Sequence, residues 1–158
     1  SFSKGMKVKM NFAIALAHHA ELLLLDEATS GLDPVMRDDV LDLLLDFVQS
    51  EKHGVLFSTH IMSDLSKIAD YIAFLHEGKL LFFKSKDELI YRYGLIHCGE
   101  KLFREIDHDD ILAWRKQDYE YQILVADREA AARKYKGCVI DPATLDSIML
   151  LNIRGKKV

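Results

Sequence analysis

The chain has 158 residues, 49% of them hydrophobic, and a formal net charge of −4 at pH 7. These values are typical of an ordinary globular protein of one domain, with room for a small second one. The acidic balance argues against a broad nucleic-acid-binding surface, so we expect no nucleic-acid partner.

Cysteine, metal and membrane signals are weak. Cys98 and Cys138 are too few for a disulfide framework and are typical of a reducing compartment. His18, His19 and His108 fall in predicted helix ends or loops, which favours solvated side chains over a metal site. No apolar run reaches the length of a membrane-spanning helix, so contact with a membrane is expected only through a partner.

The first predicted element is a helix over residues 4–19, which follows directly on the opening sequence SFSKGM. Met6, Met10 and Ala13 recur at helical spacing and form its apolar stripe. Taken alone, Ser3 indicates an ordinary N-cap. A helix N-terminus also offers free N–H groups and a favourable dipole to an anion, so this end suits a phosphate group.

Residues 22–34, LLLLDEATSGLDP, are the most informative stretch of the chain. Four leucines predict a strand that is buried on both faces. Asp26 and Glu27 then lie at its carboxyl end, where open α/β sheets bind their ligands. One carboxylate there can hold Mg²⁺ through its water shell, and the other can orient or deprotonate a water molecule. Taken alone, LLLLDE also fits a strand that simply ends in a polar loop.

A turn and a second helix follow. Asp33 is a good N-cap and Pro34 suits the first helical position, which predicts a helix over residues 35–52 with Gly54 just beyond its end. Residues 55–60 are a second apolar strand with the polar tip Ser-Thr-His, and a short helix is expected over 61–69.

Residues 71–76 and 79–84 predict a hairpin around Glu77-Gly78. A capping box at residues 85–88 starts a helix to about residue 93, which Gly94 ends. The alternation of strands and helices up to this point is an α/β pattern.

The rest of the chain predicts a small α+β appendage over residues 94–158. Its expected parts are a strand at 95–98, a helix at 101–106, a hairpin of 111–117 with 119–125, and a helix at 128–136 capped by Asp127. Asp141 and Pro142 are expected to start a last helix.

The stretch LLLLDEATSGLDP resembles the Walker B strand, catalytic glutamate and D-loop of ATP-binding cassette (ABC) ATPases. The resemblance implies that Asp26 holds Mg²⁺ through water and that Glu27 is the catalytic carboxylate. It implies a D-loop at Ser30, Gly31 and Asp33, although capping alone explains the aspartate.

Two more stretches resemble motifs of the same family at the expected places. SFSKGM is similar to the ABC signature LSGGQ, with matches at Ser3 and Gly5 and departures at Phe2, Lys4 and Met6. In the family this loop meets ATP bound on the partner subunit, and Lys4 would add positive charge there. His60 matches the switch histidine, which implies a hydrogen bond to the γ-phosphate.

The resemblance implies a fold class as well. Residues 1–93 are expected to form part of a P-loop NTPase core of the RecA-like ABC type, followed by the appendage at 94–158. The sequence contains no G-x-x-x-x-G-K-[ST] phosphate-binding loop, so the expected core lacks the P-loop strand. Strands 22–25 and 55–58 can then still pair, whereas strand 71–75 loses a neighbour. We expect exposed strand edges, self-association and negligible ATPase activity of these residues alone.

The implied function is that of an ATP-binding and ATP-hydrolysing subunit of an ABC transporter, with ATP and Mg²⁺ as cofactors. Implied partners are a second ATPase subunit, in a homodimer, and a separate transmembrane permease. The implied location is cytoplasmic, at the inner face of the membrane. The signature and the segment DPATLDSIMLL look most like those of bacterial exporters.

Two alternatives stay open at this point. An ABC-type ATPase of DNA maintenance would need no membrane, but no sustained heptads of a coiled-coil insertion occur. A non-catalytic module, in which residues from Gly94 onward bind a partner or regulate the ATPase, is compatible with the transporter interpretation.

Overall fold

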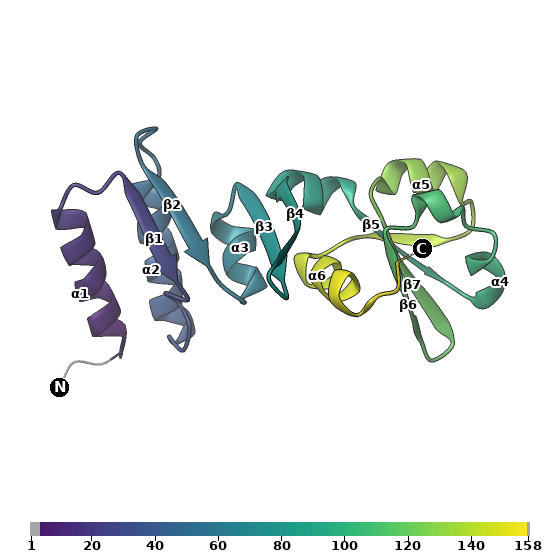
Figure 1. Ribbon diagram of the computed structural model, residues 1–158, viewed down its shortest axis with the longest axis horizontal. Helices are drawn as coiled ribbons and strands as arrows, with labels where there is room; N and C mark the ends of the chain where they lie inside the picture. The colour runs from purple at the N-terminus through teal and green to yellow at the C-terminus, as the bar shows by residue number, and fades with distance from the viewer. Residues whose placement is uncertain (1–3, 158) are drawn as a thin grey trace. The chain divides into compact units, whose positions relative to one another are not determined.

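The computed structural model describes residues 4–157 and divides the chain into two compact units, Ser1–Ala69 and Asp70–Val158 (Figure 1). The boundary predicted between residues 93 and 94 falls inside the second unit and stays a prediction. No helix within the described residues is both long and apolar enough to cross a lipid bilayer.

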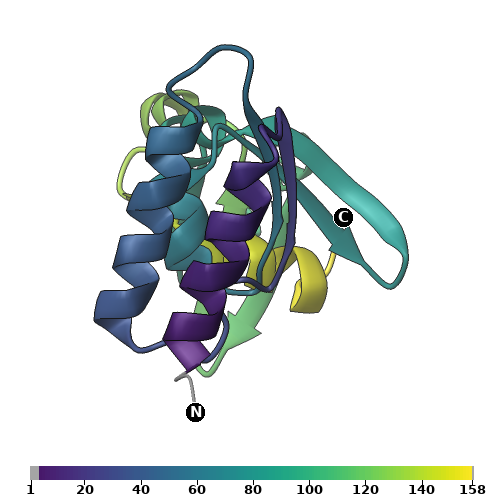
Figure 2. The same ribbon diagram turned by 90° about the vertical axis from the view of Figure 1, so that its left-hand side faces the viewer.

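The first unit has two parallel strands and three helices. In chain order its elements are α1 (Lys4–Ala17), β1 (Leu22–Asp26), α2 (Pro34–Phe47), β2 (Gly54–Ser58) and α3 (Met62–Ile68). Strands β1 and β2 pair from Leu22↔Gly54 to Asp26↔Ser58, which confirms the predicted pairing. Figure 2 shows α1 and α2 on the same side of these strands. Phe12, Leu23, Val40 and Leu44 form the core between them.

The prediction that the leucine strand is buried on both faces is wrong. Leu23 is only 4% exposed, whereas Leu22 and Leu24 are 59% and 68% exposed. Successive side chains of a strand point to opposite faces, and both helices cover the same face. Leu56 of β2 is likewise exposed.

Helix α2 ends earlier than its apolar pattern indicates. It stops at Phe47, and Gly54 begins β2 instead of capping the helix. The His53 ring stacks on the Phe47 ring at 4.3 Å, and His53 Nδ1 lies 2.9 Å from the Phe47 carbonyl oxygen. The His53 ring in the following turn therefore contacts a carbonyl group that the end of the helix leaves free. Helix propensity alone does not reveal this contact.

The second unit begins with the predicted hairpin of β3 (Tyr71–His76) and β4 (Lys79–Ser85). Glu77 and Gly78 both have positive φ, at 48° and 74°, as a two-residue turn of this kind requires. β3 pairs only with β4 within the described residues, so the open edge predicted for this strand is confirmed. A single-turn π-helix, η1 (Glu88–Arg92), follows, and Ser85 Oγ accepts from the Glu88 N–H.

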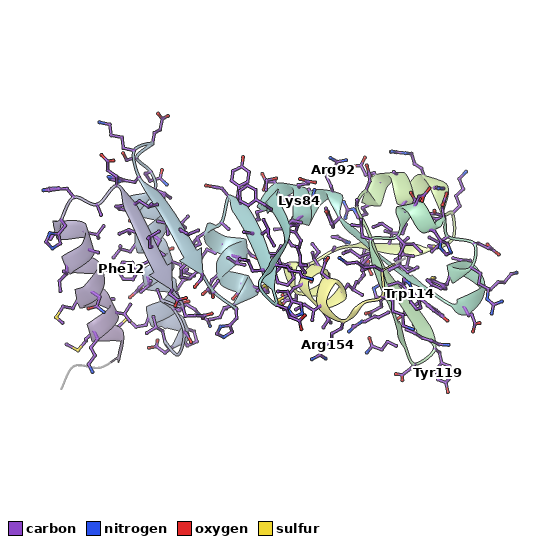
Figure 3. All side chains as sticks on the ribbon, viewed as in Figure 1. Phe12, Lys84, Arg92, Trp114, Tyr119 and Arg154 are labelled. Carbon is purple, nitrogen blue, oxygen red and sulfur yellow. The ribbon has the colours of Figure 1, made fainter. Side chains whose placement is uncertain are left out.

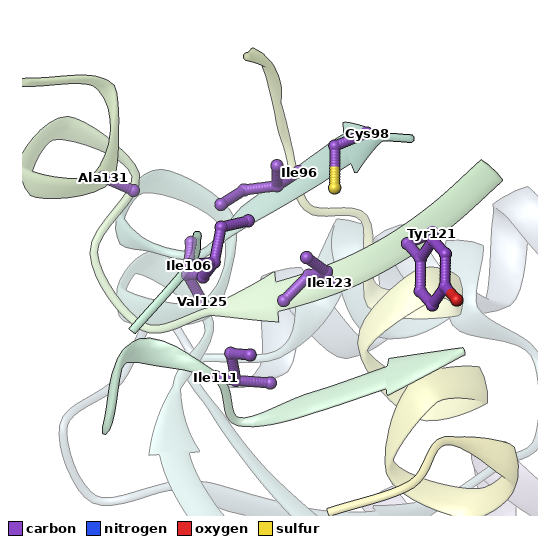
Figure 4. Close-up of a cluster of buried hydrophobic side chains, with 8 residues drawn as sticks. All are labelled: Ile96, Cys98, Ile106, Ile111, Tyr121, Ile123, Val125 and Ala131. Carbon is purple, nitrogen blue, oxygen red and sulfur yellow. The ribbon is translucent and has the colours of Figure 1, made fainter. Parts of the chain in front are cut away.

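The rest of the second unit is a four-stranded antiparallel sheet with the order β6-β7-β5-β8. Its strands are β5 (Gly94–Cys98), β6 (Ala113–Gln117), β7 (Glu120–Val125) and β8 (Val139–Pro142). Its helices are α4 (Glu100–Phe103), η2 (His108–Asp110), α5 (Arg128–Lys134) and α6 (Leu145–Arg154). Figure 4 shows its core, which comprises Ile96, Cys98, Ile106, Ile111, Tyr121, Ile123, Val125 and Ala131.

Strand β8 corrects the expected start of the last helix. Asp141 and Pro142 pair with β5 as the end of β8, and α6 begins only at Leu145. Thr144 is the N-cap, and it forms a reciprocal capping box with Ser147. The capping box satisfies the backbone N–H groups of Thr144 and Ser147, so α6 starts after Thr144 and not at Asp141 and Pro142.

Candidate active site

The candidate site lies at the carboxyl ends of β1 and β2, where the parallel pairing puts Asp26 opposite Ser58. Ser58 Oγ donates a hydrogen bond to Asp26 Oδ1. The Glu27 N–H donates to the Ser58 carbonyl oxygen at 3.0 Å, so the ladder continues one residue past β1. The second strand therefore fixes the backbone that carries both acids.

Glu27 leaves the strand in a left-handed backbone conformation, with φ at 48°. For a residue with a side chain this costs roughly 1–2 kcal/mol, and such conformations persist where the surrounding structure over-determines them. Here the hydrogen bonds to Ser58 precede the bend, and the Ser30 N–H donates to the Glu27 carbonyl oxygen at 3.0 Å after it. The bend turns the carboxylate out of the strand.

The Glu27 carboxylate faces the imidazole of His60. Glu27 Oε2 lies 2.7 Å from His60 Nδ1, and the side chains are 40% and 71% exposed, respectively. Oε2 itself is shielded from solvent, and no donor among the described residues makes a hydrogen bond to it in good geometry. The pair becomes an ion pair only when the imidazole is protonated. The Glu27 carboxylate as a whole is partly exposed, and a carboxylate at this position can accept a proton or a hydrogen bond from a water molecule.

A buried hydrogen bond fixes the turn behind Glu27. Thr29 Oγ1 donates to Asp64 Oδ2 at 2.7 Å, and both residues are 1% exposed. Arg37 Nη1 lies 3.8 Å from Asp64 Oδ1, which places a positive charge near the buried carboxylate. Asp64 belongs to the first turn of α3, the helix that follows His60 almost immediately. The sequence interpretation missed Asp64, because an acid in a first helical turn looks like an ordinary helix-start residue.

The predicted D-loop is the turn that leads into α2. Gly31 has φ at 68°, a conformation that glycine adopts without strain. Asp33 Oδ1 accepts from the Met36 N–H at 3.0 Å, which confirms the predicted N-cap. The aspartate side chain therefore has a structural role here, and a contact of Ser30, Gly31 or Asp33 with nucleotide stays a prediction.

The predicted signature residues are only partly visible. Ser3 and the Lys4 side chain lie outside the described part of the chain. Gly5 is buried in the first turn of α1, where an added Cβ would lie 2.6 Å from Met36 Cε. Close packing of α1 on α2 therefore explains the glycine, and its role toward ATP stays a prediction.

The site offers few protein ligands for Mg²⁺. Within residues 4–157, no group of three or more His, Cys, Asp or Glu side chains gathers as metal ligands. Mg²⁺ is commonly bound through one or two carboxylates, with water and substrate phosphates supplying the other ligands. Asp26 fits that kind of site, with Ser58 Oγ orienting one of its oxygens.

No protein-family model matches the chain. The lantibiotic transport ATP-binding protein SrtF of Streptococcus pyogenes is 40% identical to it over 86 residues, which are 54% of this chain and 37% of SrtF. The ABC transporter ATP-binding protein YtrB of Bacillus subtilis is 28% identical over 169 aligned positions, which cover 98% of this chain and 56% of YtrB. Further matched proteins include some named for export and some named for import.

The structural comparison leads to the same family as the sequence comparison. A solved ABC transporter in an inward-facing conformation superposes with a TM-score of 0.52 and 26% sequence identity, over 78% of this chain and 47% of that one. The mixed α/β fold is thus that of an ABC transporter ATPase. The chain spans between about a third and a little over half of the length of the curated relatives described.

The chain is therefore a partial ATP-binding domain of the ABC transporter family. Its relatives are ABC ATP-binding proteins, and the alignment with YtrB extends through the second unit as well.

Proposed function

We propose that the protein containing this chain is the ATP-binding and ATP-hydrolysing subunit of an ABC transporter. The observation that carries the proposal is the convergence of Asp26, Glu27 and His60 at the carboxyl ends of two paired parallel strands. A second ATPase subunit, in a homodimer, and a transmembrane permease are the partners we propose. The subunit would then lie in the cytoplasm against the inner face of the membrane.

Each residue of the site has a chemical task in this proposal. Asp26, oriented by Ser58, would hold Mg²⁺ through a water molecule. The metal ion, when bound, neutralises charge on the phosphates. Glu27 would orient or deprotonate the attacking water through its carboxylate, which is 40% exposed. His60 would donate to the γ-phosphate while its ring stays next to Glu27.

We further propose that the direction of transport is export, and that the permease selects the transported compound. Export rests on the resemblance of SKGM and of the last helix to bacterial exporters. Uptake or release of a labelled compound by vesicles containing the complete transporter would decide the direction.

The catalytic assignment is tested in the longest natural protein that contains these residues. Glu27→Gln should lower the rate of ATP hydrolysis by roughly 10²–10⁴-fold, the usual contribution of a general base. Mg·ATP binding should persist. Glu51→Gln, which alters an exposed acid in the turn after α2, is the matched control and should leave the rate unchanged.

Residues 1–158 alone contain no phosphate-binding loop sequence, and we propose that they hydrolyse ATP negligibly. Hydrolysis by this chain that Glu27→Gln abolishes would contradict that proposal. An unaltered rate in the longer Glu27→Gln protein would instead contradict the role of Glu27.

A further inference from the structure

The second unit carries a cationic cavity that the ATPase assignment does not use. The cavity has a volume of about 460 Å³, and its lining residues are Trp114, Arg115, Lys116, Tyr121, Arg154 and Lys156. We refer to these six residues as the basic pocket. They come from β6, β7, the end of α6 and the residues after it, and Figure 3 labels Trp114 and Arg154. Four cations thus line one cavity in a chain whose net charge is −4.

The chain fixes the pocket through its backbone. The Trp114 N–H donates to the Lys156 carbonyl oxygen at 2.9 Å, and the Lys156 N–H donates to the Trp114 carbonyl oxygen at 2.7 Å. Lys156 is therefore held as a single antiparallel bridge beside β6. Its ammonium lies over the Trp114 ring, 5.3 Å from the centroid, and the Lys116 ammonium lies over the Tyr121 ring at 5.2 Å. The rings position the cations without neutralising them.

Arg115 is also positioned without being neutralised. Its Nε donates to Gln122 Oε1 at 2.7 Å, and its Nη2 donates to Gln117 Oε1 at 3.1 Å. Both acceptors are uncharged amides, so the guanidinium keeps its full charge and its remaining N–H groups. A guanidinium held in a fixed orientation loses less conformational entropy when it binds a planar or tetrahedral anion.

Carboxylates contribute little to the balance of charge in the pocket. Glu100 Oε2 lies 4.0 Å from Lys116 Nζ, but Glu100 is already bonded to Arg104 at 2.6 Å. Arg154 and Lys156 have no carboxylate within ion-pair distance among residues 4–157. The cations repel one another with little compensation from carboxylates, and a multivalent anion would offset that repulsion.

We propose that the basic pocket binds a phosphate-bearing ligand with two or more negative charges. Arginine and lysine together favour phosphate oxygens, through directed guanidinium bonds and a point charge respectively. The cavity is of the size that small-molecule sites have. A soluble diphosphate or nucleotide and the headgroup of an anionic phospholipid share this chemistry. All six residues of the basic pocket belong to the second unit, and the proposal does not depend on the role proposed for the acids at the ends of β1 and β2.

Trp114 makes the pocket measurable, because it is the only tryptophan in the chain. Inorganic pyrophosphate, titrated at constant ionic strength without Mg²⁺, should change the Trp114 emission as the Lys156 ammonium shifts from the ring toward the anion. Calorimetry under the same conditions gives the affinity. Arg154→Gln and Lys156→Gln should each weaken binding about tenfold, which is about the loss of one charge-assisted hydrogen bond.

The two variants alter exposed side chains, so the fold should survive, and circular dichroism checks this. Lys136→Gln removes an exposed charge outside the pocket and is the matched control. An equal loss in Lys136→Gln would mean non-specific charge screening and would overturn the proposal. So would a double variant, Arg154→Gln with Lys156→Gln, that responds like the unaltered chain.

A second experiment distinguishes a soluble phosphate ligand from a lipid headgroup. Vesicles of phosphatidylcholine are compared with vesicles of phosphatidylcholine and phosphatidylglycerol in equal parts. A Trp114 response to the anionic vesicles that the double variant loses assigns the site to a lipid headgroup. A response to pyrophosphate alone assigns it to a soluble ligand. No change of Trp114 emission with either pyrophosphate or anionic vesicles would show that the basic pocket binds no phosphate group.

Discussion

At Glu27 one backbone angle decides where the proposed catalytic carboxylate points. The residue holds φ at 48°, its N–H donates to the Ser58 carbonyl oxygen of β2, and its carbonyl oxygen accepts from the Ser30 N–H in the following turn. The bend exposes the carboxylate to His60 but requires a conformation that most side chains disfavour. Stability and catalysis therefore make different demands on the same position.

Two substitutions at Glu27 separate these demands. Asparagine tolerates a left-handed backbone and valine does not, so we expect Glu27→Asn to be more stable than Glu27→Val by about 1 kcal/mol. Both should lose ATP hydrolysis in the longer protein. Urea denaturation of the two variants measures the difference, and equal midpoints would show that the backbone relaxes out of the bend.

The Thr29–Asp64 bond gives a second prediction for single residues. Thr29→Val leaves a buried carboxylate without its hydroxyl donor, and we expect a loss of about 1–3 kcal/mol in the free energy of unfolding. Thr29→Ser keeps the hydroxyl and should lose less. A double-mutant cycle with Asp64→Asn measures the coupling, and additive losses would mean that the bond contributes nothing.

The two cysteines should differ in reactivity. Burial raises the pKa of the Cys98 thiol to about 11, and Cys98 is 7% exposed. Burial also raises the pKa of Cys138, which is less enclosed. At pH 8 only about a thousandth of Cys98 is thiolate, the reactive form. Thiol labelling of Cys138→Ala, which retains Cys98, should be much slower than that of Cys98→Ala. Equal rates would show that the second unit opens readily.

Among the elements, η2 and α5 are joined by ion pairs. Lys134 Nζ lies 3.1 Å from Asp107 Oδ2 and 2.7 Å from Asp110 Oδ2, and the Tyr135 hydroxyl donates to Asp110. The hydrogen bond from Lys134 is the main cause of a lowered pKa at both carboxylates. The same bonds raise the pKa of Lys134. The cluster is thus most stable when all three groups are charged.

This cluster predicts acid sensitivity with a defined sign. A carboxylate whose pKa is lower in the folded state stabilises the fold above its unfolded pKa, near 4. That stabilisation disappears as the pH falls through the lower, folded value. The melting temperature should therefore fall below pH 4, and Lys134→Gln should flatten this dependence. Lys136→Gln is the control, and a pH profile that Lys134→Gln leaves unchanged would argue against the cluster.

Much of the element order is readable from the sequence, because the local signals agree with the tertiary contacts. The apolar runs and turn residues of β1, β2 and the β3–β4 hairpin are of this kind. Strand β8 was missed because Asp-Pro is typical of a helix start, whereas β5 recruits both residues into the sheet. In the site, Asp26, Glu27 and His60 are recognisable from motifs. Asp64 carries no local signal, since only the fold shows that it is buried.

For the whole molecule, the uncovered apolar surface matters most. Leu24 and Leu56 of the first unit are 68% and 67% exposed, and Leu75 and Phe83 of the second unit are 66% and 63% exposed. Each group lies on a two-stranded sheet, and such surfaces invite association with another chain. The sequence pattern of one strand does not show which other elements cover its two faces. For this reason the leucine run led to a wrong prediction of burial on both faces.

We therefore expect residues 1–158 to self-associate at micromolar concentration. Light scattering should give a mass above that of one chain, and Leu24→Lys with Leu56→Lys should shift it toward the monomer. Ile14→Lys adds a charge at an exposed apolar position of α1 and is the matched control. A single monomeric species in the unaltered chain would contradict this prediction.

The buried bond between Thr29 and Asp64 has a mechanical consequence. Asp64 moves with α3, and α3 begins just after His60, where Thr59 Oγ1 accepts from the Ile61 N–H at 3.0 Å. A push on α3 is therefore passed to two places at once, the turn behind the glutamate and the backbone next to the histidine. We therefore expect Glu27 and His60 to move together when α3 is displaced, and the distance between the carboxylate and the imidazole to change little.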